Sequence, residues 1–371
     1  MIKKILLFLG LILVLLIGYL SFWPVNIEPQ AWDAPTSEGY TGVFTPNMAL
    51  AGLNNLSIGE HHGPEDVAAR YEDGEMIAYT STQSGDIIRI NTNKNTHKVV
   101  ANTGGVALGI QFDANGNLII ADAHKGLLSL DEDGEITLLT DTAEDGSPLL
   151  YADELDIAAD GKIYFSDAST KFGAKSSSST LNASLLEIME HGGTGRVLVY
   201  DPADKTTKTI ATGLTFANGI AMCPDDECLL VAETGSYQIL KLWLKGKKKG
   251  EIEPVITNLP GFPDNINRGL DGRYWVGLTS PRSADLDKMS NSPGLRKAVQ
   301  RLPAFMRPQA ELYGFVFAID VDGNVIAQYQ DPSASYPLTT GATEPGDGWL
   351  YIGSLGATYL GRKDVRHEKY Q

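Results

Sequence analysis

The stretch Gly261-Phe-Pro-Asp-Asn-Ile266 places a carboxylate and an amide side by side at the end of a short apolar run. A second run, Arg273-Tyr-Trp-Val-Gly-Leu278, follows the turn Asp271-Gly272 and is typical of a β-strand. An unpaired carboxylate buried between two strands costs several kcal/mol in lost hydration. We therefore expect other parts of the chain to offer Asp264 a cation or hydrogen-bond donors.

The same unit recurs along the chain: a short strand, a turn of Gly, Asp or Asn, and a second β-rich strand. The turns are Asp73-Gly74, Asn115-Gly116, Asp160-Gly161, Asp225-Asp226, Asp271-Gly272 and Asp347-Gly348. The residues that lead the six repeats are Glu65, Leu108, Asp153, Asn218, Asp264 and Thr340. They are 43, 45, 65, 46 and 76 residues apart, and three of these steps match the roughly 40–50 residues of a four-stranded propeller blade. The sequence therefore predicts an all-β protein, a six-bladed β-propeller over residues 55–371.

The two long steps contain insertions. Residues 169–195 are Ser-rich and then helix-like, and residues 281–313 are punctuated by prolines. The second insertion carries apolar residues at amphipathic spacing: Met289, Leu295, Val299, Leu302, Phe305 and Met306. This segment is predicted either to form an apolar lid over the channel, favouring hydrophobic substrates, or to be a helix packed on the propeller.

The leading residues predict a metal site. The first strand of each propeller blade lines the central channel, so Glu65, Asp153, Asn218 and Asp264 should converge on one axis. Four oxygen donors, three of them carboxylates, suit a hard cation such as Ca²⁺, which takes about six to eight oxygens. The alternative is that these side chains satisfy strand ends or bind channel water. Four of them in register favour the metal.

The N-terminus predicts a membrane anchor over residues 1–23. The stretch from Ile5 to Trp23 is apolar and uncharged, and at about 1.5 Å per residue it is just long enough to span a bilayer core. Lys3 and Lys4 predict a cytoplasmic N-terminal side, which places the propeller on the extracytoplasmic side. A cleaved signal peptide is the competing interpretation, but we find no small-x-small cleavage site before Pro24. Residues 24–54 are predicted to be a linker, with a candidate closing strand of the last blade within residues 39–56.

Composition narrows the function classes. A hydrophobic content of 43% can supply a core, and 39 glycines fit a turn-rich β fold. A net charge of −16 argues against a nucleic-acid partner, which needs a basic face. The chain has no Gly-x-Ser-x-Gly, His-Glu-x-x-His or phosphate-loop motif, so serine hydrolases, zinc proteases and nucleotide enzymes have no support.

The cysteines and histidines give weaker predictions. Cys223 and Cys228 flank a four-residue turn, so a disulfide across a tight hairpin is a hypothesis that an exported domain permits. His62 precedes the first repeat and His124 follows a second strand. Either histidine is a candidate for the channel mouth, although isolated histidines near turns are more often surface residues.

Ordered motifs across residues 55–360 resemble the strictosidine synthase-like branch of six-bladed propellers, and most closely the membrane-anchored members of that branch. These motifs are His62-Gly-Pro-Glu-Asp66, Ala152-Asp-Glu-Leu-Asp-Ile157, Phe216-Ala-Asn-Gly219, Val231-Ala-Glu-Thr234 and Gly261-Phe-Pro-Asp-Asn265. The wider superfamily includes paraoxonases and gluconolactonases, and the resemblance implies a channel calcium bound by Glu65, Asn218 and Asp264. Asp153 stands where the third-blade ligand is usually Asn.

The resemblance also shows departures. Strictosidine synthases use a catalytic Glu in the last blade. In this chain the carboxylate nearest to the equivalent part of the last blade is Glu344. Leu108 stands where paraoxonases carry a histidine. The activity that survives is metal-assisted hydrolysis of a hydrophobic ester or lactone, of arylesterase or lactonase type. In that mechanism Asp264 attacks the carbonyl or deprotonates a water, and Asn265 orients the Asp264 carboxylate.

Two other function classes stay open. One is a strictosidine synthase-like lyase, which predicts no metal requirement. The other is a membrane-tethered binding propeller without activity, since fold alone does not establish function.

Overall fold

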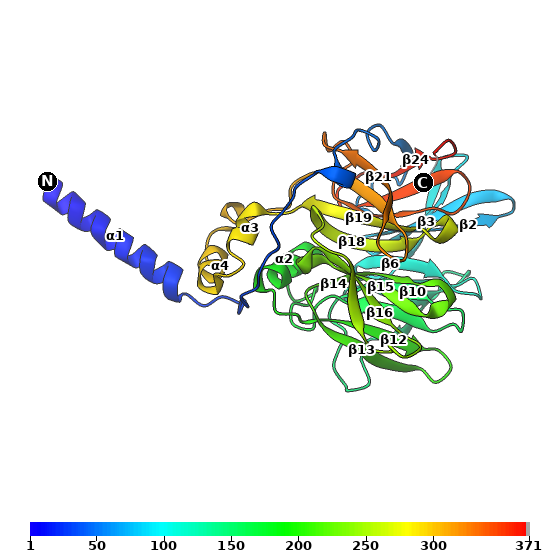
Figure 1. Cartoon of the computed structure of the whole chain (residues 1–371), viewed down its shortest axis with the longest axis horizontal. Helices are drawn as coiled ribbons and strands as arrows, with labels where there is room; N and C mark the ends of the chain where they lie inside the picture. Colours follow the sequence, from blue (N-terminus) through cyan, green and yellow to red (C-terminus); the bar gives the residue numbers. More distant parts are fainter. Residues whose placement is uncertain (369–371) are drawn as a thin grey trace.

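The computed structural model describes residues 1–368, and six four-stranded antiparallel sheets form its globular part (Figure 1). The first strand of each sheet contacts the first strand of the next, and the sixth returns to the first, so the sheets close into a ring. The predicted six-bladed β-propeller is therefore confirmed. Residues 369–371 of the predicted propeller range lie outside the described residues.

The first three blades run in sequence order from the channel outwards. Blade one contains β2 (Pro64–Glu72), β3 (Glu75–Thr82), β4 (Asp86–Asn91) and β5 (Thr96–Asn102). Blade two contains β6 (Ala107–Phe112), β7 (Leu118–Asp122), β8 (Gly126–Leu130) and β9 (Ile136–Thr140). Blade three contains β10 (Ala152–Ile157), β11 (Ile163–Asp167), β12 (Gly195–Asp201) and β13 (Thr206–Leu214).

Blades four and five follow the same order, and the sixth is completed by a strand from the N-terminal side. Blade four contains β14 (Ala217–Met222), β15 (Cys228–Glu233), β16 (Gln238–Trp243) and β17 (Ile252–Ile256). Blade five contains β18 (Gly261–Arg268), β19 (Tyr274–Pro281), β20 (Gly314–Ile319) and β21 (Val325–Asp331). Blade six contains β22 (Thr339–Thr343), β23 (Trp349–Ser354), β24 (Tyr359–Asp364) and β1 (Asn54–Ser57). The outermost pairing sets Leu56 opposite Leu360, which ties the two ends of the propeller together.

The α-helices lie at one end of the propeller (Figure 1). The α-helices are α1 (Ile2–Phe22), α2 (Thr180–Glu190), α3 (Ala284–Lys288) and α4 (Pro293–Gln300). The 3₁₀ turns are η1 (Gly42–Phe44), η2 (Pro224–Asp226), η3 (Thr234–Ser236), η4 (Leu270–Gly272) and η5 (Ala304–Met306). The two predicted insertions therefore contain α2 in the first and α3, α4 and η5 in the second. α1 is long and apolar enough to cross a membrane, and its residues are not buried against the propeller.

The predicted turns connect the first and second strands of every blade. Gly74 and Gly161 adopt φ of +81° and +83°, a conformation that glycine reaches without steric cost. In blade four, where no glycine is present, Asp225 takes the left-handed conformation with φ +57°. Cys223 and Cys228 flank that turn and are joined by a disulfide, with their Cα atoms 5.1 Å apart.

Every inner strand carries a bulge at the same position. In blade one, Pro64 pairs with Thr82 and Val67 pairs with Thr80, so β2 uses one more residue than β3 over this interval. The other five inner strands shift register at the equivalent place. The two bulge residues of each blade are Glu65-Asp66, Leu108-Gly109, Asp153-Glu154, Asn218-Gly219, Asp264-Asn265 and Thr340-Gly341. A bulge changes the direction in which the side chains of a strand point. All the candidate ligands are residues of these bulged pairs.

Candidate metal centre and pocket

A pocket of about 1020 Å³ opens at the helical end of the channel. Of the six residues predicted to lead the repeats, Glu65, Leu108, Asp153, Asn218 and Asp264 line this pocket. The bulges explain the placement, because the first residue of each bulged pair lies at the same level of its inner strand. The four candidate ligands therefore line one pocket.

Two amides and two carboxylates form cross-blade hydrogen bonds. The Nδ2 group of Asn218 donates to Oδ1 of Asp264, which joins blades four and five. The Nδ2 group of Asn265 donates to Oε1 of Glu65 at 3.0 Å, which joins blades five and one. Asn265 was expected to orient Asp264. The structure assigns that contact to Asn218, because consecutive bulge residues reach different neighbours.

Four oxygens of this cluster are buried without a hydrogen-bond partner among the described residues. They are Oε2 of Glu65, Oδ2 of Asp153, Oδ1 of Asn218 and Oδ1 of Asn265. Buried polar atoms are nearly always satisfied, so four such acceptors in one place fit a cation or a hydrogen-bond donor.

Burial and mutual repulsion raise the pKa values of these carboxylates. Burial is the main cause that raises the pKa of Glu65 well above its usual range, and the nearby Asp264, Asp66 and Asp153 add to it. Burial also raises the pKa of Asp153, with a contribution from Asp264. For Asp264, burial raises the pKa to about 7 despite the hydrogen bond from Asn218. Three buried carboxylates in one cluster are stabilised in the charged state by a cation.

The donor set fits a hard divalent cation. Glu65, Asp153, Asn218 and Asp264 offer carboxylate and amide oxygens, and Asn265 adds a fifth oxygen that the sequence had not assigned to the metal. Within residues 1–368, no group of three or more His, Cys, Asp or Glu side chains is by itself arranged to hold a metal. The amide oxygens of Asn218 and Asn265 are the non-carboxylate donors that this cluster could offer to a cation.

A second polar layer supports the first. The second bulge residue is Asp66, Glu154 or Asn265 in blades one, three and five, and glycine in blades two, four and six. Asp66 accepts hydrogen bonds from the backbone N–H of Ile110 at 2.9 Å and from Nδ2 of Asn267 at 3.0 Å. A Cβ atom on Gly109 would lie 2.2 Å from Oε1 of Glu154. The alternation of large and absent side chains lets this layer fit inside the ring.

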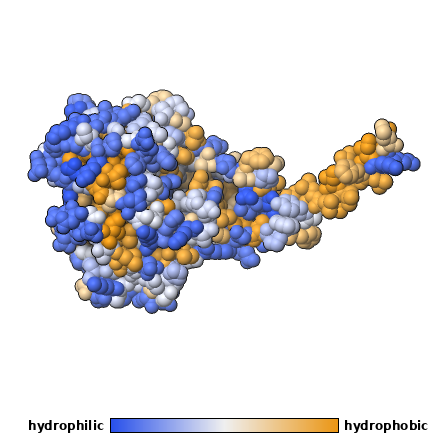
Figure 2. Space-filling model, turned by 180° about the vertical axis from the view of Figure 1, so that it is seen from behind, coloured by the Kyte–Doolittle hydropathy of each residue, from blue (hydrophilic) through white to orange (hydrophobic). Residues whose placement is uncertain are grey.

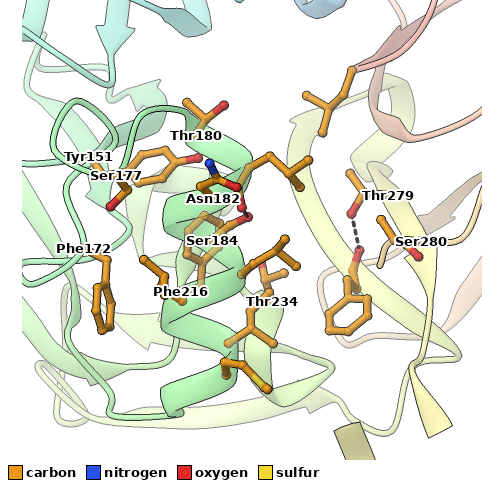
Figure 3. A pocket seen from close by; sticks show the side chains of 18 of the residues that line it. Tyr151, Phe172, Ser177, Thr180, Asn182, Ser184, Phe216, Thr234, Thr279 and Ser280 are labelled. Atoms are coloured by element: carbon orange, nitrogen blue, oxygen red, sulfur yellow. Dashed lines mark hydrogen bonds between the residues drawn. The ribbon is translucent and has the colours of Figure 1, made fainter. Parts of the chain in front are cut away.

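The pocket wall above these ligands is largely apolar. Figure 3 shows Tyr151, Phe172 and Phe216 near α2, with Thr279 and Ser280 of β19 across the pocket. The rings of Tyr151 and Phe216 meet edge to face at 5.2 Å between centroids. Leu181, Leu185 and Ile188 of α2 extend this wall. The site is suited to an apolar molecule with one polar group directed at the carboxylates.

The structure places the other candidate residues outside the pocket. His62 is exposed in the loop before β2, and His124 lies in the β7–β8 turn, where its backbone N–H is held by Asp122. Neither histidine is among the residues lining the pocket. Glu344 is buried between blades, with Oε1 2.9 Å from Nη2 of Arg273 and Oε2 accepting from Nε1 of Trp275 at 2.9 Å. It also does not line the pocket.

The apolar residues of the second insertion mostly point elsewhere. The insertion borders the pocket through Leu286, Gln300, Ala304, Arg307 and Pro308. The six residues proposed for the inside of a lid are not among the pocket-lining residues. Leu295, Phe305 and Met306 are instead exposed to the outside, while Met289 is buried. The amphipathic pattern identified an insertion with an apolar side but not the direction in which that side faces.

Comparisons with known proteins agree with this architecture. The Strictosidine synthase family profile matches residues 153–247, and the N-terminal profile of strictosidine synthase-like proteins matches residues 42–90. Among solved structures, a gluconolactonase from Xanthomonas campestris superposes with a TM-score of 0.60 at 18% identity, covering 90% of this chain and 97% of that one. A calcium-binding protein, regucalcin, from Agrobacterium tumefaciens gives 0.55 at 15% identity, covering 81% and 85%. At such identities these two structures show the shared fold.

Closer relatives extend over nearly the whole chain. The Salmo salar adipocyte plasma membrane-associated protein is 32% identical, covering 91% of this chain and 84% of its own. The strictosidine synthase-like protein 6 of Arabidopsis thaliana is 31% identical, covering 97% of this chain and 95% of its own. On this similarity, the chain belongs to the family of strictosidine synthase-like and adipocyte plasma membrane-associated proteins.

Proposed function

We propose that this protein hydrolyses esters or lactones of apolar compounds and holds a divalent cation in its channel. The oxygen donors of the site favour calcium as that cation. The observation that carries the proposal is the set of four orphaned buried oxygens, contributed by four blades. Three of them belong to Glu65, Asp153 and Asn218, which line an apolar-walled pocket. A bound cation at this place would polarise the carbonyl of the substrate. The fold likeness to a gluconolactonase does not by itself transfer that activity, so the proposal rests on the site.

The protein's own side chains have separable roles in this proposal. Glu65, Asp153, Asn218, Asn265 and one oxygen of Asp264 hold the cation, and Asn265 also restrains Glu65 through its hydrogen bond. Asp264 lines the pocket, and its Oδ2 has no hydrogen-bond partner among the described residues. This oxygen is placed to attack the carbonyl or to take a proton from an attacking water. The walls formed by Phe172 and Phe216 bind the apolar part of the substrate.

Glu344 does not favour the lyase alternative. Its carboxylate is engaged by Arg273 and Trp275 between blades, and a general base must reach the proton it removes. A binding propeller without activity would use the same pocket and the same cation. The difference between the two functions is turnover, which the following experiment measures.

The experiment compares aryl ester and lactone hydrolysis by the full chain in detergent with calcium, with a chelator, and with the variant Asp264→Asn. We expect both treatments to reduce kcat/KM by about a hundredfold or more, since one well-placed charged group or cation supplies several kcal/mol. The matched control is Asp133→Asn, an exposed turn residue of the same type, which should keep full activity. Turnover that is indifferent to both treatments would discard the site. Calcium binding without turnover would favour the binding propeller.

A further inference from the structure

The second insertion is bound directly to the end of α1. Arg301 follows α4 and donates from Nε to the carbonyl of Trp23 at 2.5 Å and from Nη1 to the carbonyl of Leu20 at 2.8 Å. The hydroxyl of Tyr19 donates in return to the carbonyl of Arg301 at 2.9 Å. The last carbonyls of a helix lack intrahelical partners and carry partial negative charge, so an arginine is a suitable cap. The insertion is thus held where α1 ends.

The end of α1 is an interfacial position if α1 spans a bilayer. Its 21 residues extend about 30 Å at 1.5 Å per residue, which matches a hydrocarbon core. Tyr19 and Trp23 at its C-terminal end are exposed, and these residue types concentrate at membrane interfaces. A segment bonded to the carbonyls of Leu20 and Trp23 would therefore lie at the level of the lipid headgroups.

The insertion and α2 expose a group of large apolar side chains on this side of the molecule. We call this group the anchor-side face, and its members are Leu181, Leu295, Phe305, Met306 and Leu312. Phe305 is 83% exposed and Leu312 is 61% exposed. Figure 2 shows hydrophobic surface on the anchor and on the lobe that adjoins it. Several exposed apolar side chains in one region indicate an interaction surface rather than ordinary solvent exposure.

The charge of the same segment is opposite to that of the chain. Residues 288–310 contain five basic residues and no acidic one, although the whole chain carries −16 and Asp285, Asp287 and Glu311 flank the stretch. Arg296 is buried and Arg301 binds the end of α1, so the basic side chains left to meet lipid are Lys288, Lys297 and Arg307. Apolar side chains next to basic ones are the pattern of a segment that lies in a lipid interface, where the basic groups meet phosphates. A protein partner would need an apolar surface reaching down to the bilayer, so the lipid is the simpler occupant.

The pocket opens beside this face. Its lining includes Leu181 and Leu185 of α2 and Ala304, Arg307 and Pro308 of the insertion. Phe305 and Met306 therefore lie between residues that line the pocket, with their side chains on the outside. We propose that the anchor-side face is seated in the interfacial layer of the bilayer that holds α1, so that the mouth of the pocket opens beside the lipid. An apolar ester or lactone dissolved in the membrane would then have direct access, a consequence that rests on the proposed function.

The test places a probe at single positions of the full chain. Both natural cysteines are in the disulfide, so an introduced cysteine is the one reactive thiol. Phe305→Cys and Leu312→Cys test the face, and Trp23→Cys reports on insertion of the anchor. The matched control is Tyr71→Cys. Tyr71 is also exposed, but it lies near the end of β2 that is far from Glu65. Each variant carries a polarity-sensitive fluorophore and is reconstituted in bilayers of phosphatidylcholine and phosphatidylglycerol.

The expected result is blue-shifted emission at positions 305 and 312, with quenching by a shallow nitroxide lipid about threefold stronger than at position 71. Iodide in water should quench the probe at position 71 and spare those at 305 and 312. The proposal is overturned if the probes at 305 and 312 behave like the probe at 71 while the probe at 23 reports lipid. It is equally overturned if position 23 itself is in water. None of these readouts depends on hydrolysis, so failure of this proposal and failure of the proposed activity are distinguishable.

Discussion

Asn265 in blade five donates a hydrogen bond from Nδ2 to Oε1 of Glu65 in blade one at 3.0 Å, across 200 positions of the sequence. This contact links two bulges that face the same channel and leaves Oδ1 of Asn265 and Oε2 of Glu65 buried without a partner among the described residues. An amide whose nitrogen bonds a carboxylate and whose oxygen is orphaned can rotate to offer that oxygen to a cation. Asn265 is thus a fifth ligand candidate.

Replacing Asn265 tests that role. Asn265→Ala removes one oxygen and the donor that restrains Glu65, so calcium affinity should fall by about tenfold or more, equivalent to about 1.4 kcal/mol. Titration calorimetry of the full chain measures the change. Asn115→Ala, in an exposed turn, is the control and should bind as tightly as the wild type. Equal affinity of both variants would remove Asn265 from the ligand set.

Removal of divalent cations should destabilise the propeller. Glu65, Asp153 and Asp264 are buried together, and each has a raised pKa, so a cation that binds only the folded state adds about 2.7 kcal/mol at a hundredfold excess over Kd. For a domain of this size we expect Tm to rise by roughly 5 °C from chelator to saturating calcium. Differential scanning calorimetry gives this shift, and it should disappear in Glu65→Gln. A Tm independent of calcium in the wild type would contradict the prediction.

Filling the gap at Gly109 should disturb the layer below the ligands. A Cβ atom there would meet Oε1 of Glu154 at 2.2 Å and its Cα atom at 2.8 Å. We expect Gly109→Ala to lower the free energy of unfolding by about 1–3 kcal/mol through overpacking. The control is Gly294→Ala in α4, where an added Cβ has no heavy atom within 4 Å. Urea denaturation that shows equal stability for the two variants would refute the close fit.

The buried position of His191 leads us to expect that the folded protein loses stability in mild acid. Burial, together with the positive charge of Arg296, lowers the pKa of His191 to about 4, against an ordinary value of about 6.5. Between these values the unfolded chain binds more protons than the folded one, so stability is present above pH 6.5 and is lost as pH falls towards 4. His191 ends α2 with φ +53°, so His191→Asn keeps a residue that tolerates this conformation.

The measurement is thermal unfolding of the wild type and His191→Asn at pH 7 and pH 5. The decrease in Tm between these pH values should be smaller in the variant than in the wild type. His62→Asn replaces an exposed histidine and should retain the full decrease. An identical decrease in the wild type and His191→Asn would assign the acid sensitivity to other groups.

The propeller, and the position of the candidate site along the inner strands, could be predicted from the sequence. The reason is that the same turn residues and the same leading positions recur in each blade. Asp73-Gly74 and its equivalents mark one turn in every blade, and this periodicity depends only on local backbone preferences. The leading residues Glu65 and Asp264 follow from the same spacing. Such features are fixed by short stretches of chain, so a single sequence contains them.

The bulges and the side-chain partners required the structure. A regular strand sends consecutive residues to opposite faces, so the polar doublets Glu65-Asp66, Asp153-Glu154 and Asp264-Asn265 were a signal that the inner strands are not regular. A single leading residue carries no such signal, which appears only when both residues of a doublet are considered together. The choice of Asn218 as the partner of Asp264 depends on how neighbouring blades pack, which spacing along the chain does not specify. The outward direction of Phe305 likewise depends on how the insertion packs, which spacing along the chain does not specify.

The most direct test of the channel site is crystallography of the calcium-loaded protein, with anomalous data collected at long wavelength. We predict one peak in the channel, with carboxylate oxygens of Glu65, Asp153 and Asp264 and amide oxygens of Asn218 and Asn265 within about 2.3–2.6 Å of it. Saturating calcium with no peak in the channel, or with a peak elsewhere only, would contradict the site.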